Sequence, residues 1–194
     1  MNLIITAFLL TLSVLLLSYF AYRKAFFSPR ANRTAIAATE GPQFEPHRDA
    51  MRRIFVQLAE RPYEDITIQS HDGLTLWARY YQFAPGAPME LMFHGYRGNA
   101  DRDLCGGVQR CFALGRSALV VDQRACGRSE GTVITFGAKE HKDCLYWVEY
   151  MVKRFGPDVK IILTGISMGA ATVLMAAGRE LPENVIGVLA DCGY

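Results

Sequence analysis

The segment IILTGISMGAATVL, residues 161–174, is the most informative part of the sequence. Its first residues are short and apolar, which predicts a buried strand, and its last residues predict a helix. Between them lies GISMG, residues 165–169, a G-x-S-x-G pattern. In that context the pattern predicts a turn so tight that Gly165 and Gly169 must lack side chains, with the hydroxyl of Ser167 held out of the sheet. Ser167 is therefore a candidate nucleophile, and a glycine-serine turn without chemistry is the alternative.

A second motif, MFHGY at residues 92–96, ends an earlier apolar run. Acyl transfer needs two backbone donors for its oxyanion, one after the nucleophile and one in the loop after this earlier strand. We expect these donors to be the N–H groups of Tyr96 and Met168. Gly95 would let the backbone pass close to the substrate, and His94 would brace the loop, with a general base as its alternative role.

The flanking pattern predicts alternating strands and helices. Apolar runs of strand length occur at 89–93, 118–121, 160–164 and 185–190, with helical stretches at 101–114, 137–155 and 168–181. Because the strands are apolar on both faces, we expect a mostly parallel sheet covered by helices on both sides. Upstream, the sequence predicts an amphipathic helix at 51–58 and a hairpin formed by 65–69 and 74–83.

The composition excludes some classes of function. The 194 residues carry 21 basic and 19 acidic side chains, a net charge of +2, without a basic run that would indicate nucleic-acid binding. The five cysteines form no C-x-x-C pair and have no histidine at zinc-finger spacing. They are expected to be buried thiols of a reducing compartment rather than disulfides or a metal site.

The N-terminus predicts a membrane anchor. Residues 3–22 are uncharged and about as long as a helix that crosses roughly 30 Å of hydrocarbon. A cleaved signal peptide is the alternative, but no basic residue precedes the run and no small-x-small site follows it. Basic residues follow the run directly, which predicts a single-pass protein with a cytoplasmic domain. We divide the chain into an anchor (1–25), a linker (26–45) and a globular part (46–194).

Several motifs together resemble a known family. YEDITIQSHDGLTLWARYY (63–81), FHGYRGNA (93–100), VVDQRACGRSEG (120–131) and GISMGAATVL (165–174) are similar to the α/β-hydrolase superfamily, most closely its membrane-anchored bacterial serine aminopeptidase-like or Bem46-like members. The resemblance implies an α/β-hydrolase fold. It places Ser167 at the nucleophile, Tyr96 and Met168 at the oxyanion hole, and Asp122 and Arg124 in a supporting segment. Relatives often have histidine where this chain has Cys126, which is given no role.

In this fold the triad runs Ser, then Asp or Glu, then His. No histidine follows Ser167, and the later acids are Glu180, Glu183 and Asp191, of which Asp191 is a possible triad acid. The expected explanation is a C-terminally truncated domain.

The resulting expectation is a serine hydrolase that acts on ester, thioester or amide bonds through an acyl-enzyme on Ser167. Its substrate would be a small-molecule ester or thioester, or a peptide. Its partner is the lipid bilayer, and it has no cofactor, no metal and no nucleic-acid partner. The alternative is a non-catalytic membrane-anchored remnant or a partner-binding scaffold. Its basis is that no histidine follows Ser167 to act as the base and that the later acid of the family's triad is missing.

Overall fold

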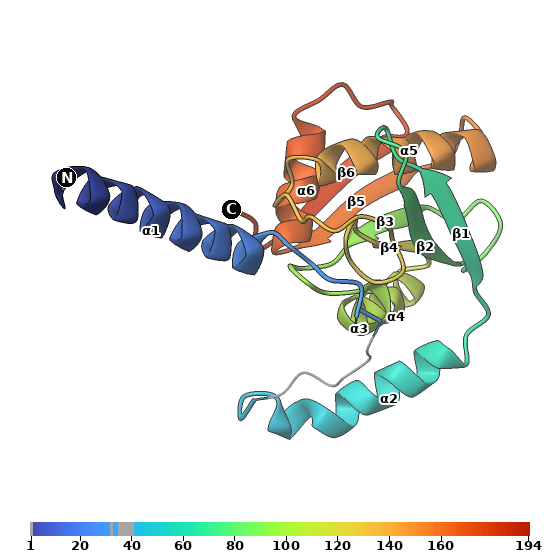
Figure 1. Ribbon diagram of the computed structural model, residues 1–194. Helices are drawn as coiled ribbons and strands as arrows, with labels where there is room; N and C mark the ends of the chain where they lie inside the picture. Colours follow the sequence, from blue (N-terminus) through green and yellow to red (C-terminus); the bar gives the residue numbers. More distant parts are fainter. Residues whose placement is uncertain (1, 32, 35–40) are drawn as a thin grey trace.

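The computed structural model describes residues 2–31, 33–34 and 41–194, and a six-stranded sheet forms its centre (Figure 1). The strands lie in the order β1-β2-β4-β3-β5-β6. β4, β3, β5 and β6 run parallel, whereas β1 and β2 form the predicted antiparallel hairpin, with β2 also antiparallel to β4. The mostly parallel sheet is thus confirmed. The strand bounds are β1 Glu64–Gln69, β2 Thr75–Tyr81, β3 Met89–Phe93, β4 Ser117–Asp122, β5 Ile161–Ile166 and β6 Val185–Asp191.

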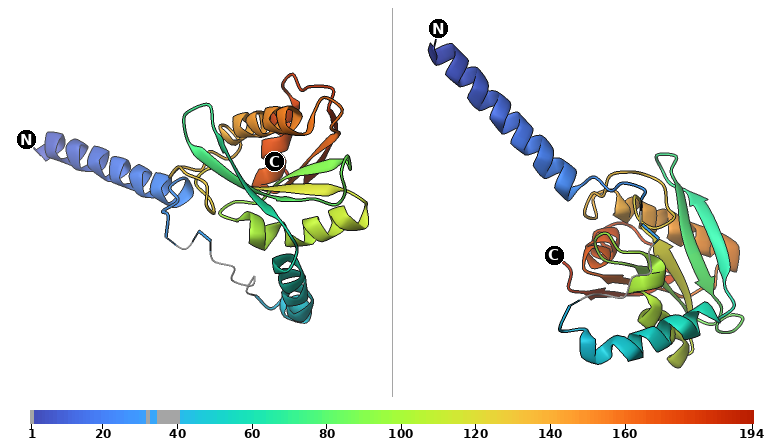
Figure 2. Two further views of the ribbon diagram at one scale, coloured as in Figure 1. Left: turned by 90° about the vertical axis from the view of Figure 1, so that its right-hand side faces the viewer. Right: turned by 60° about the horizontal axis from the view of Figure 1, so that its bottom comes forward.

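Helices cover both faces of the sheet (Figure 2). α5 (Glu140–Phe155) and α6 (Met168–Ala177) lie on one face, and α3 (Ala100–Asp103) and α4 (Cys105–Ala113) on the other. α2 (Arg48–Ala59), which follows the short 3-10 helix η1 (Glu45–His47), packs on α4.

The two-residue period of a strand explains why both faces are apolar. In β2, Leu76, Ala78 and Tyr80 join the core under α5 and α6, whereas Trp77 and Tyr81 join the core under α4. The sheet is therefore packed on both faces and provides a frame for the loops at its edge.

α1 (Asn2–Ala25) projects away from the domain as a single apolar rod (Figure 1). An 18-residue window of Leu3–Ala25 has a mean hydropathy of 2.4 and no buried residue, so the length and composition of this helix suffice to cross a membrane. Of the predicted linker 26–45, residues 32 and 35–40 lie outside the described residues. The linker starts with a docked segment rather than a free tether, because Phe27 forms an antiparallel bridge with Val133.

Two predicted helices differ from the observed ones. The stretch 101–114 is divided into α3 and α4 at Leu104, whose φ of −107° and ψ of 2° interrupt the helix while its side chain is fully buried. The stretch 168–181 is helical only to Ala177, since Gly178 follows and favours the end of a helix.

The glycine pair in α4 provides a stability prediction. A Cβ at Gly106 would meet no atom within 4 Å, so Gly106→Ala should raise the free energy of unfolding by about 0.5–1 kcal/mol through helix propensity. A Cβ at Gly107 would lie 2.3 Å from Cε of Met92. This clash should cancel the gain in helix propensity, so Gly107→Ala is the matched control. Urea unfolding followed by the fluorescence of the buried Trp77 and Trp147 measures both. A Gly106→Ala protein no more stable than Gly107→Ala would contradict the expectation.

Candidate active site

The turn between β5 and α6 is the predicted elbow. Ser167 has φ +54° and ψ −116°, a left-handed conformation that costs a residue with a side chain about 1–3 kcal/mol. A Cβ at Gly165 would lie 2.1 Å from the carbonyl oxygen of Gly169, and a Cβ at Gly169 would lie 2.1 Å from that of Phe93. The geometry therefore requires glycine at both positions, as the sequence predicts.

The hydroxyl of Ser167 is left without a partner. Ser167 precedes the first residue of α6, but its side chain does not cap the helix. Its backbone N–H donates to the carbonyl oxygen of Asp191 over 2.8 Å. In the described part of the chain no group is hydrogen-bonded to Oγ, so a half-buried hydroxyl stands at the positive end of a helix dipole.

The loop after β3 lies directly against the elbow. An ideal Cβ on Gly95 would lie 3.7 Å from Cβ of Ser167 and 3.8 Å from the carbonyl oxygen of Ile166. Tyr96 follows Gly95, and Met168, which is fully buried, follows Ser167. The structure thus brings the predicted nucleophile and the segments that carry both predicted oxyanion donors together.

His94 is buried and both of its ring nitrogens are occupied. Nε2 accepts from the backbone N–H of Gln123 over 3.0 Å, so the ring proton is on Nδ1, which donates to the carbonyl oxygen of Gly95 over 2.7 Å. This arrangement fits the bracing role, and a general base would need a free nitrogen.

Gln123 is a site residue that the sequence reasoning missed. Its side-chain amide donates to the carbonyl oxygen of His94 over 2.6 Å, and its Oε1 accepts from Oγ1 of Thr172 in α6 over 2.9 Å. It therefore ties the loop after β3 to the helix after the elbow. A polar residue at the end of a buried strand, between Asp122 and Arg124, was the available signal.

Asp122 fixes two further loops. Its Oδ1 accepts from the N–H of Ala100 over 2.7 Å and its Oδ2 from the N–H of Arg128 over 2.8 Å. Burial raises the pKa of this carboxyl, although these backbone donors act in the opposite direction. Asp122, in the predicted supporting segment, thus holds the start of α3 and the loop after β4 in position.

Arg124 joins two carboxylates behind the site. Its guanidinium donates to both oxygens of Asp143, over 2.6 Å each, and to both oxygens of Asp72, over 2.9 and 3.1 Å. Hydrogen bonds from Arg124 hold the pKa of Asp72 below its usual range, whereas burial raises that of Asp143. The network links the hairpin turn, the loop after β4 and α5.

The possible triad acid does not contact the hydroxyl. Asp191 reaches Ser167 through its backbone carbonyl, while its exposed side chain accepts from the thiol of Cys192 over 3.2 Å. Among the described histidines, the ring of His71 lies by Asp72 and that of His141 by the carbonyl oxygen of Gly137. None of these groups is hydrogen-bonded to Oγ of Ser167.

The cysteines are free thiols in the described structure, and three are buried. Burial raises the pKa of Cys126 to about 12, so this thiol stays protonated and unreactive.

Comparisons with known proteins identify a family and show how much of each relative's length this chain covers. A family model described as alpha/beta hydrolase fold matches residues 91–193, more than half of the chain. The acyltransferase drtE of Aspergillus calidoustus is 29% identical over 119 residues, which are 59% of this chain and 38% of that protein.

Solved structures are similar in fold. An esterase from Pyrococcus furiosus superposes with a TM-score of 0.66 at 20% identity, over 87% of this chain and 57% of its own. The alpha/beta hydrolase GrgF from Penicillium sp. sh18 superposes with a TM-score of 0.56 at 24% identity, over 66% of this chain and 44% of its own. The chain therefore covers between 38% and 57% of the length of these proteins.

Proposed function

Because the chain belongs to the alpha/beta hydrolase fold family, we propose that it is a serine hydrolase acting on ester, thioester or amide bonds through an acyl-enzyme on Ser167. The observation that carries the proposal is the left-handed backbone of Ser167 between two glycines that admit no Cβ. Strained backbone of this kind clusters at active sites, which supports the proposal. The esterase and acyltransferase relatives both act on acyl groups by name, which supports the same chemistry.

In the proposed reaction, Oγ of Ser167 attacks the acyl carbonyl carbon and the N–H groups of Tyr96 and Met168 stabilise the resulting oxyanion. The hydroxyl proton passes through a general base to the leaving alcohol, thiol or amine, and water then releases the acid. The described residues supply the nucleophile and the donors. The proposal gives the base no residue, and Asp191 remains only a prediction as the acid.

We further propose that α1 is retained as a single-pass anchor with the domain in the cytoplasm. The end of this helix is bonded to the domain, since the hydroxyl of Tyr96 donates to the carbonyl oxygen of Ala25 over 2.7 Å. A cleaved signal peptide would be removed from the protein, and this contact would be lost with it. Arg23 and Lys24 follow the apolar run and favour the cytoplasmic orientation.

A fluorophosphonate probe tests the assignment of Ser167. We expect the probe to label the protein and Ser167→Ala to reduce labelling to background, because no other serine in the described residues has a positive φ. The matched control is Ser18→Ala in α1, which should label like the unmodified chain. The experiment uses the 194-residue chain in detergent. If its labelling does not depend on Ser167, the non-catalytic, partner-binding alternative replaces the proposal.

A further inference from the structure

The end of α1 is bonded to the loop that carries the oxyanion donor. We call residues 24–28 the docking segment. The hydroxyl of Tyr96 donates to Ala25, and the guanidinium of Arg97 donates to the carbonyl oxygens of Lys24, over 2.7 Å, and Phe27, over 2.9 Å. Both donors directly follow Gly95, which lies against Ser167. The membrane helix and the candidate site are therefore joined through one short loop.

We call the contact between the docking segment and the loop after β3 the joint, and an aromatic stack reinforces it. The ring of Phe26 meets the ring of Phe136 edge-on at 5.4 Å, and Phe136 stacks on Tyr96 at 5.2 Å with 16° between the planes. Tyr22, at the end of the apolar run, stacks on Phe26 at 5.5 Å. The rings form a continuous path from the bilayer helix to the loop beside Ser167.

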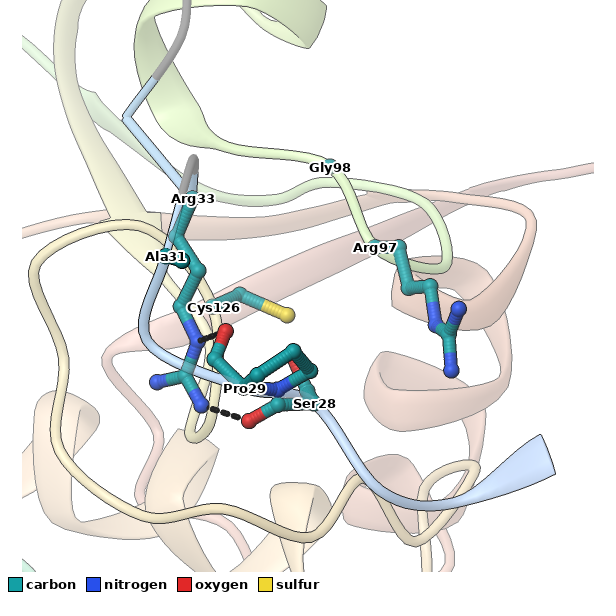
Figure 3. Close-up of a pocket in the computed structure, with 7 residues that line it drawn as sticks. All are labelled: Ser28, Pro29, Ala31, Arg33, Arg97, Gly98 and Cys126. Atoms are coloured by element: carbon teal, nitrogen blue, oxygen red, sulfur yellow. Dashed lines mark hydrogen bonds between the residues drawn. The ribbon is translucent and has the colours of Figure 1, made fainter. Parts of the chain in front are cut away.

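Backbone hydrogen bonds fix the position of the docking segment. The N–H of Ser28 donates to the carbonyl oxygen of Thr132, and the N–H of Ile134 donates to that of Phe26, both over 2.9 Å. Arg33 donates to the carbonyl oxygen of Gly131 over 3.1 Å, and to those of Ser28 and Pro29 (Figure 3). The distance between site and membrane is thus set by bonds and not by a flexible tether.

These bonds enclose a cavity of about 220 Å³ under the chain that leaves the docking segment. Figure 3 shows Arg33 turned back towards Ser28 and Pro29, and Arg97 donates to the carbonyl oxygens of Lys24 and Phe27. The guanidinium groups of Arg33 and Arg97, which line the cavity, donate to backbone carbonyl oxygens. The cavity is therefore part of the joint and not a second site.

The joint places the site at the level of the membrane surface. An α-helix rises about 1.5 Å per residue, so Ala25 lies about 4.5 Å beyond Tyr22 along the axis. That level belongs to the lipid headgroups. Since Tyr96 is bonded to Ala25, only the length of one tyrosine side chain separates the headgroup region from the loop beside Ser167.

Exposed apolar residues surround the same place. In α6, Leu174 is 48% exposed and Met175 is 41% exposed. A Cβ on Gly137, the neighbour of Phe136, would lie 2.7 Å from the sulfur of Met175, which puts Met175 beside the joint. Figure 1 shows α6 on the side of the domain from which α1 departs. Apolar side chains at this position suit contact with lipid.

We propose that the candidate site opens onto the bilayer surface and that its substrates are membrane lipids, whose acyl ester lies at headgroup depth. This inference rests on the proposed function of Ser167. The acyl group would pass from the ester oxygen of the lipid to Oγ of Ser167, the serine proton would go to the departing alcohol, and water would then release the fatty acid. The lipid would not need to leave the membrane.

The test uses the full chain in phosphatidylcholine vesicles and two fluorophosphonates that differ only in a hexadecyl or an ethyl chain. We expect the hexadecyl probe to label Ser167 about tenfold faster, because the docked site meets the bilayer-confined probe at high local concentration. A flexible insertion of about ten residues after Ala25 should remove most of this preference and leave ethyl labelling unchanged. The matched control has the same insertion after Pro42, outside the docking segment. Equal preference in the two insertion variants would overturn the proposal.

A second measurement separates this inference from the proposed function. A diazirine-bearing phosphatidylcholine should crosslink to Tyr96, Phe136, Leu174 and Met175, but not to Val56, which is 51% exposed on α2 across the sheet. Crosslinks at Val56 alone would overturn the proposed position of the site whatever the reactivity of Ser167. Loss of labelling by both probes, with the crosslinks intact, would instead reject Ser167 as the nucleophile.

Discussion

Replacement of Gly169 by alanine is expected to lower the free energy of unfolding by about 3 kcal/mol or more, enough to leave little folded protein. The new Cβ would lie 2.1 Å from the carbonyl oxygen of Phe93, 2.6 Å from its carbonyl carbon and 2.7 Å from the carbonyl oxygen of His94. These are backbone atoms at the end of β3, which is held between β4 and β5. They cannot move away as a flexible side chain would.

Gly187→Ala is the matched control for that substitution. Gly187 lies in β6, has no neighbour within 4 Å of its ideal Cβ and does not have a positive φ. Alanine there should change the free energy of unfolding by less than about 1 kcal/mol, since the strand accommodates it. Urea unfolding followed by tryptophan fluorescence in detergent compares the two proteins. Equal stabilities would mean that the elbow tolerates a side chain at Gly169.

The elbow could be predicted from the sequence because its requirement is local. A serine forced to a positive φ between a strand and a helix needs glycines at fixed offsets, and residues 165–169 supply them. The strands could be predicted for a similar reason, since buried parallel strands are apolar on both faces. Leu104 shows the limit of periodicity, because an apolar residue at helical spacing marks the break between α3 and α4.

The docking segment could not be predicted because its contacts are distant in sequence. Phe26 and Phe136 meet through a loop without helical or strand periodicity. Nothing in the composition of the predicted linker distinguishes Phe27, which pairs with Val133, from a residue of a free tether. The same holds for Gln123, whose three contacts join the loop after β3 to α6. Local patterns carry no information on such pairings.

Arg124→Met is expected to lower the free energy of unfolding by about 3–5 kcal/mol, because it leaves the carboxylate of Asp143 buried without its partner. The side chain of Asp143 is 5% exposed and Arg124 meets both of its oxygens. The double variant Arg124→Met with Asp143→Leu should recover much of the loss. The surface pair of Arg154 and Glu64 provides the matched control, since Arg154→Met should cost about 1 kcal/mol or less.

The pH dependence distinguishes an unpaired charge from lost packing. His71 and Lys139 also face these carboxylates, but Arg124 makes the close contacts. In the unmodified chain the lowered pKa of Asp72 stabilises the fold above the unfolded value of about 4, and this stabilisation is lost as the pH falls below it. In Arg124→Met the pKa of Asp143, already raised by burial, should rise further. Acidification would then protonate this carboxylate and remove its unpaired charge. The stability difference between the two proteins should therefore shrink between about pH 7 and about pH 4. A constant difference across that range would attribute the loss to packing of the Arg124 side chain and not to the charge of Asp143.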